Sequence, residues 1–136
     1  MNLSAIMDEV ASVLGEITGL NVFAYPPATL SPPAGYVSYP ASVDFDAAYG
    51  RGVDRITGLP IALLAGEPTE PSTRDQVATW AAGAGGQSVK ARMEAHTWTS
   101  CDDLTVTSCS FDVETVAGVD YLAAAFTADI IGSGRE

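Results

Sequence analysis

The sequence predicts an α+β fold: an antiparallel or mixed β-sheet of about five strands, with an N-terminal helix and a broken middle helix packed on it. Three observations predict this class. The chain opens with apolar residues at helical spacing, strand-like segments fill its second quarter and its last third, and a polar segment interrupted by glycines lies between them. Over 136 residues, folding buries about two-thirds of the surface of the extended chain, which supports one core. We therefore expect residues 1–136 to form a single domain.

The N-terminal helix is predicted over residues 3–17. Seven apolar side chains recur there at spacings of three and four, which places them on one side of a helix: Leu3, Ile6, Met7, Val10, Val13, Leu14 and Ile17. Asp8 and Glu9 lie on the opposite side. The apolar side is expected to lie on the sheet.

Two strands are expected next. Residues 20–25 predict a short strand that ends at Pro26, because proline has no N–H to donate to a ladder. Residues 35–45 predict a second strand, in which Pro40 indicates an edge position or a bulge. One face of this second strand is expected to be open.

A third strand is predicted over residues 53–64, after a loop at 46–52 that contains two glycines. Gly58 and Pro60 indicate an irregular middle, and residues 61–64 indicate a buried end. The second and third strands are expected to form a long, bent hairpin.

The middle helix is predicted in two pieces. Ser72, with Asp75 three residues later, resembles a capping box and is expected to start the first piece. The glycines of residues 83–86 end it, since each costs roughly 1 kcal/mol in a helix interior. Ser88 can cap the second piece, which is expected to continue to Ala95.

The last third of the chain predicts a β-hairpin. Its arms are residues 104–116 and 119–131, which are rich in Thr, Val, Phe and Tyr, and residues 117–118 are the turn. Both faces of the second arm are largely apolar, so we expect each face to be covered.

The charge balance excludes direct nucleic-acid recognition. The chain has 17 acidic and 6 basic residues and a net charge of −11, whereas phosphate binding requires clustered Lys and Arg. The N-terminus has no basic segment ahead of an apolar stretch, and no apolar run reaches the ~20 residues that a membrane helix needs. A soluble, intracellular protein with no membrane partner is expected.

No catalytic, metal or cofactor site is predicted. His96 is the only histidine, and we interpret it as a cation near the C-terminal end of the second helical piece, because a catalytic triad is recognised by geometry and not by sequence position. Cys101 and Cys109 lack the close spacing of zinc ligands and are interpreted as reduced, small apolar residues. Residues 83–90 lack the spacing of a phosphate-binding loop.

Paired carboxylates are the sequence pattern that is compatible with metal binding or acid–base catalysis. Three pairs occur: Asp44 with Asp46, Asp102 with Asp103, and Asp112 with Glu114. Side chains at i and i+2 of a strand project from one face roughly 7 Å apart, which suits a divalent ion or acid–base work. A solvated strand face is the favoured interpretation, because 17 acids on so small a chain pair by chance.

The loop that follows the second strand is a candidate subunit interface. Tyr49, Arg51 and Arg55 place an aromatic ring close to two cations, and Tyr and Arg are favoured interface residues. We expect them to meet acids of a neighbouring copy, with Asp44 and Asp46 close by. An ordinary hairpin tip is the alternative.

Several sequence segments of the chain resemble those of a known protein family. Five segments carry the resemblance: LSAIMDEVASVLGEI, LNVFAYPP, PPAGYVSYP, DAAYGRGVDR and VAGVDYLAAAFTADI. Together with the order of helices and strands, they resemble the tail-terminator proteins of long-tailed, siphovirus-type bacteriophages, and most of all those of phages that infect high-GC actinobacteria. The resemblance covers nearly the whole chain and contains no catalytic signature.

The resemblance implies a structural virion protein with no enzymatic activity and no cofactor. Such a subunit forms a ring, commonly a hexamer, that caps the tail tube, stops its polymerisation and joins the tail to the connector and neck proteins of the head. Its partners are copies of itself, the tail tube protein and the neck proteins, and it resides in the virion after assembly in the host cytoplasm. DNA is expected to pass through the lumen without specific binding, because an acidic wall repels phosphates.

Two other functions stay open. Another head-to-tail joining protein, a stopper or an adaptor, would have the same size and acidity, and binding to tail tubes or to filled heads distinguishes the two. A small acidic ligand-binding protein or a hydrolase that uses the paired carboxylates would instead be a monomer with a concave pocket lined by perturbed acids.

Overall fold

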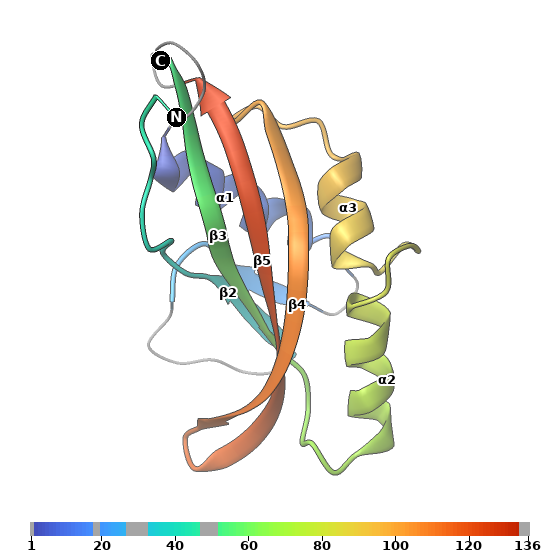
Figure 1. Cartoon of the computed structure of the whole chain (residues 1–136). Coiled ribbons are helices and arrows are strands. Elements are labelled where there is room, and N and C mark those ends of the chain that lie inside the picture. The colour runs from blue at the N-terminus through green and yellow to red at the C-terminus, as the bar shows by residue number, and fades with distance from the viewer. Residues whose placement is uncertain (1, 18–19, 27–32, 47–51, 134–136) are drawn as a thin grey trace.

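The computed structural model describes residues 2–17, 20–26, 33–46 and 52–133. These residues form the predicted α+β architecture, with three helices on one sheet of five strands (Figure 1). The elements in chain order are α1 (Leu3–Leu14), β1 (Asn21–Phe23), β2 (Ala34–Val37), β3 (Val53–Leu64), α2 (Pro71–Trp80), α3 (Val89–Ala95), β4 (Asp103–Val116) and β5 (Val119–Ser133). None of the described helices is long and apolar enough to cross a membrane.

The sheet is mixed and mostly antiparallel. Its strand order is β1-β2-β3-β5-β4, so β1 and β4 are the two edges. β1 pairs with β2 in parallel, and the other neighbouring strands are antiparallel. The hairpin predicted for the last third is confirmed, because β4 and β5 pair along their length. Its turn has positive φ at Ala117 (52°) and Gly118 (81°), as a tight two-residue turn requires.

One face of the sheet carries the hydrophobic core. All three helices contribute side chains to the same buried cluster as this face of the sheet, for example Ile6, Val77 and Met93 together with Ile61 and Phe126. In Figure 1, α1 lies behind the sheet, and α2 and α3 stand end to end beside it. The apolar side predicted for the first helix is therefore confirmed as its core-facing side.

The strand predicted over residues 35–45 is shorter than expected. β2 ends at Val37, where the Ser38 N–H still donates to the Pro60 carbonyl at 2.9 Å, and the next pairing with β3 is an isolated bridge between Asp44 and Arg55. Pro40 lies in this interruption and has no N–H to offer to a ladder.

Register shifts bend β3 and β4 at the same level of the sheet. The shift in β3 lies at residues 56–59 and the shift in β4 at residues 106–108, and both strands meet β5 at Ala128. Gly58 has a φ of 75°, and its N–H donates to Oδ1 of Asp129 at 3.0 Å. The irregular middle predicted for the third strand is thus confirmed.

The middle helix is broken as predicted, but the predicted capping box is wrong. α2 begins with Glu70 as its N-cap residue and Pro71 at its first position, which places Ser72 inside the helix. The fixed φ of proline suits the first turn, so Pro71 decides where the helix starts. The cap predicted at Ser88 is confirmed, since its Oγ accepts a hydrogen bond from the Ala91 N–H at 3.2 Å.

The face of the sheet opposite the core is only partly covered. On β5, Ala123 is 3% exposed, but Ala125 in the next position on this face is exposed. The expectation that both faces of the second arm are covered is therefore wrong at Ala125. Alanine exposes little apolar area, and Thr127 and Asp129 make the following positions of the same face polar.

Candidate functional site

The structure brings together part of the predicted interface where β3 begins. Asp44 and Arg55 exchange two backbone hydrogen bonds of 2.8 and 2.9 Å. The Arg55 side chain is exposed, and it is the one Lys or Arg side chain in the described segments without an ion pair. Tyr49 and Arg51 lie outside the described residues.

Asp46 forms hydrogen bonds to residues at the start of β3 and just before it. It has a φ of 52°, and its Oδ1 accepts a hydrogen bond from the Gly52 N–H at 3.0 Å. Its own N–H donates to Oδ1 of Asp54 at 3.3 Å, and Asp54 is only 6% exposed. Asp46 is thus engaged within the subunit, whereas the side chains of Asp44 and Arg55 face solvent.

A second polar cluster, which the sequence did not predict, joins α1 to the segment after α3. The carboxylate of Glu9 accepts hydrogen bonds from the N–H groups of Thr99 and Ser100 at 3.1 and 2.9 Å and from Ser100 Oγ at 2.6 Å. Nε2 of His96 lies 2.7 Å from the same carboxylate. Burial raises the pKa of Glu9, but the hydrogen bonds from Ser100, His96 and Thr99 outweigh it and lower the pKa to about 2.

This cluster contains a serine, a histidine and an acid, but it has no catalytic-triad geometry. In a triad the imidazole lies between the acid and the nucleophile. Here the carboxylate of Glu9 lies between Ser100 and His96 and accepts from both. The imidazole also stands edge-on to the Trp98 ring, with centroids 4.7 Å apart. The arrangement holds a chain segment against α1.

The three predicted carboxylate pairs are not gathered into one site. Oδ1 of Asp103 accepts from the Leu104 N–H at 2.9 Å, and Oδ1 of Asp112 accepts from the Val113 N–H at 2.8 Å. Within the described segments, no group of three or more His, Cys, Asp or Glu is placed to hold a metal ion. Asp44 and Asp102 are exposed, whereas Glu114 is half-buried and its charge adds to the effect of burial in raising the pKa of Tyr36.

Neither cysteine forms a disulfide bond. Cys101 is 5% exposed and belongs to the core cluster. Burial raises the pKa of the Cys109 thiol, which keeps it protonated and weakly nucleophilic near neutral pH. Neither cysteine is placed as a catalytic nucleophile.

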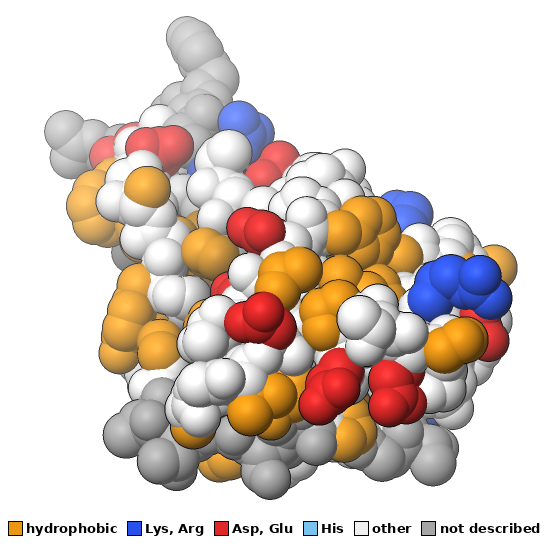
Figure 2. Space-filling view, turned by 90° about the horizontal axis from the view of Figure 1, so that it is seen from below, with side chains coloured by type: hydrophobic (Ala, Val, Ile, Leu, Met, Phe, Trp, Pro, Cys, Tyr) orange, Lys and Arg blue, Asp and Glu red, His pale blue; other side chains and the backbone are white. Residues whose placement is uncertain are grey.

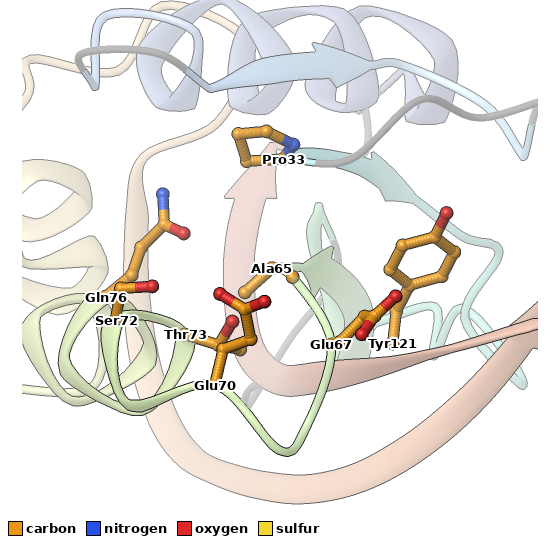
Figure 3. A pocket seen from close by; sticks show the side chains of 9 residues that line it. Pro33, Ala65, Glu67, Glu70, Ser72, Thr73, Gln76 and Tyr121 are labelled. Carbon is orange, nitrogen blue, oxygen red and sulfur yellow. The ribbon is translucent and has the colours of Figure 1, made fainter.

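A hollow of about 600 Å³ lies between the end of β3 and the start of α2 (Figure 3). Glu67 and Glu70 contribute two carboxylates to its wall, and Thr73 and Tyr121 contribute hydroxyl groups. None of the predicted carboxylate pairs lines it. This hollow has the concave form that a ligand-binding protein requires, but its acids are not the predicted ones.

Besides Phe45, which is 75% exposed between Asp44 and Asp46, large hydrophobic side chains are exposed in two places. On the β4–β5 hairpin, near its turn, Phe111 and Val113 of β4 and Val119 of β5 are 56%, 48% and 37% exposed. Beyond the ends of β1 and β2, Tyr25 and Tyr39 are 56% and 61% exposed and border a groove of about 360 Å³ against α1. Figure 2 shows the molecule from the end that carries the hairpin turn, with hydrophobic side chains among carboxylates. We call these the hairpin surface (Phe111, Val113, Val119) and the tyrosine surface (Tyr25, Tyr39).

Neither a comparison with protein-family models nor one with curated proteins finds a match for this chain. The proposed function therefore rests on the exposed surfaces and on the resemblance in sequence.

Proposed function

We propose that this protein is a subunit of a ring that caps a bacteriophage tail tube, ends tube polymerisation and joins the tail to the neck of the head. The observation that carries the proposal is the presence of two exposed hydrophobic surfaces at opposite edges of one sheet, the hairpin surface and the tyrosine surface. A subunit that binds both its own copies and other proteins needs more than one such surface. The sequence resemblance to tail terminators supports the same function.

The charge of the subunit sets the conditions for assembly. Each copy carries a net charge of −11, so a closed ring repels itself, while its acidic wall lets DNA pass without trapping phosphates. We expect native mass spectrometry to find an assembly of about six times the subunit mass of 14.0 kDa, more populated when magnesium is added because cations screen the carboxylates. An assembly that weakens as magnesium rises contradicts this role of the charge.

Purified tail tubes give the decisive test of the function itself. Added during tube polymerisation, the protein is expected to stop growth and to shorten the tubes seen by electron microscopy. Density for a ring at one tube end supports the proposal. Binding to filled heads without binding to tubes identifies a stopper or an adaptor instead. A monomer that leaves tube length unchanged overturns the proposal and favours a ligand for the hollow beside Glu67 and Glu70.

Reversing the charge at the candidate interface is expected to abolish the ring. Arg55 is exposed and forms no ion pair with the described residues, so Arg55→Glu combined with Arg51→Glu places new carboxylates against acids of the neighbouring copy. Native mass spectrometry is expected to show monomers, while the circular dichroism spectrum stays unchanged. Arg74→Glu is the control, because Arg74 is an exposed cation that already pairs with Asp75. Rings that persist in the double variant place the subunit interface elsewhere.

A further inference from the structure

Strand β4 exposes part of its outer edge. It pairs with β5 on one side only, and the hairpin turn fixes which of its backbone groups point away from β5. The residues that flank a two-residue turn form a hydrogen-bonded pair, and such pairs alternate along an antiparallel ladder. The N–H and C=O groups of Cys109, Phe111, Val113 and Thr115 therefore point outward.

Two side-chain contacts agree with this assignment. The Val113 N–H donates to Oδ1 of Asp112 at 2.8 Å, as expected for an amide that points away from β5. The register shift at residues 106–108 makes the even-numbered positions point outward in the first part of β4. There the Val106 N–H donates to Oε2 of Glu94 at 3.0 Å.

The two parts of this edge differ in whether their outward N–H groups have hydrogen-bond acceptors. Beside Val106, α3 covers the edge, and a hydrogen bond from Lys90 lowers the pKa of Glu94, so that the acceptor of the Val106 amide is ionised at neutral pH. Between Cys109 and Thr115, no described residue accepts from the outward amides of Cys109, Phe111 or Thr115. This part of the strand contains neither proline nor lysine, the residues that commonly prevent edge pairing. We call it the open edge.

On the open edge, apolar and acidic side chains lie on opposite faces of the sheet. Phe111 and Val113 lie on the core face of the sheet but beyond the cover of the helices, and Val113 also borders a hollow of about 600 Å³ near the hairpin turn. Asp112 and Glu114 lie on the opposite face. Figure 2 shows both kinds of side chain at this end of the molecule, with Lys and Arg side chains only toward the margin.

We propose that the open edge binds an extended segment of another protein as an additional β-strand, and that this segment alternates basic and apolar residues. Backbone hydrogen bonds to the outward amides and carbonyls hold the segment, as in other complexes that extend a sheet. Its basic side chains lie beside Asp112 and Glu114, and its apolar side chains lie beside Phe111 and Val113. The inference does not depend on the proposed ring, because a monomer offers the same edge.

A second copy of this chain is the less suitable occupant. Antiparallel pairing of two β4 strands places Asp112 and Glu114 of one copy beside the same carboxylates of the other, on one face of the joined sheet. Like charges in opposite positions destabilise a strand pair. The acids of the open edge therefore oppose self-pairing and favour a basic segment.

A synthetic peptide tests the proposal. The probe is the acetylated and amidated heptapeptide VKVKVKV, titrated into the full-length protein and followed by amide hydrogen exchange. Saturable binding is expected, with slower exchange at Cys109, Phe111 and Thr115 and unchanged exchange at Val106, which Glu94 already protects. The same peptide with every amide N-methylated keeps its side chains but donates no hydrogen bonds, and it is expected to bind at least about tenfold more weakly. Equal binding of the two peptides overturns strand addition.

Charge variants test the preference for a basic segment. Glu114→Lys is expected to weaken binding of VKVKVKV by about fivefold, because an attractive cross-strand pair becomes a repulsive one. Asp8→Lys on α1 makes the same change in net charge away from the open edge and is expected to leave binding unchanged. Equal losses in the two variants show unspecific attraction and overturn the proposal. Amides of the open edge that already exchange slowly without peptide, and more slowly at higher protein concentration, identify a second copy as the occupant and overturn it too.

Discussion

Replacing Phe126 with alanine is expected to lower the free energy of unfolding by about 4 kcal/mol. Phe126 is 2% exposed in β5 and pairs with Ile61 on one side and Cys109 on the other. The truncation removes the apolar contacts of the ring and leaves a cavity between the sheet and the helices. Urea unfolding followed by circular dichroism measures the loss.

Phe111 provides a matched control on the same face of the sheet. It pairs with Ala124, two pairs further toward the turn, but it is 56% exposed. Phe111→Ala is therefore expected to cost less than about 1 kcal/mol, as is usual for an exposed side chain. Equal costs for the two variants mean that the hairpin surface is covered in solution, and they contradict the open edge of β4. A small cost for Phe126→Ala contradicts its place in the core.

The spacing of apolar residues predicts which elements form better than it predicts where they end. The first helix is predicted to Ile17 but ends at Leu14. The second strand is predicted over residues 35–45, yet β2 ends at Val37, because the extent of a strand depends on a neighbour with free backbone groups and not on its own pattern. The start of α2 is similar, since Pro71 fixes the first turn and excludes the predicted cap at Ser72.

The candidate surfaces were harder to predict because they arise from contacts between distant parts of the chain. Glu9 lies on the polar side of its helix in the sequence pattern, and its partners Thr99 and Ser100 follow 90 and 91 residues later. The alternation in β4 places Phe111 and Val113 on the apolar face, but it does not show that the helices end before reaching them. Only the lengths and placement of α2 and α3 reveal this exposure.

Replacing Glu9 with glutamine is expected to lower stability at neutral pH and to flatten its decrease in acid. The pKa of Glu9 is about 2 in the folded protein, against an ordinary value of 4.5, so folding favours the ionised form. Its contribution is complete above pH 4.5 and is lost as the pH falls toward 2. These two pKa values correspond to at most about 3 kcal/mol. The expected cost of Glu9→Gln at pH 7 is about 2 kcal/mol, because the amide oxygen still accepts some of the hydrogen bonds.

Urea unfolding at steps from pH 7 to pH 2 measures both effects. Glu16→Gln is the control just beyond the C-terminal end of α1, since the Glu16 side chain is 66% exposed and forms an ion pair with Arg92 at 3.4 Å. It is expected to change stability by less than about 0.5 kcal/mol and to keep the acid dependence. If the Glu9→Gln variant loses stability between pH 4.5 and 2 as steeply as the original chain, other carboxylates cause the acid sensitivity. A flatter dependence in Glu9→Gln alone means that one carboxylate of α1 fixes residues 96–100, and with them the position of α3 over the edge of β4.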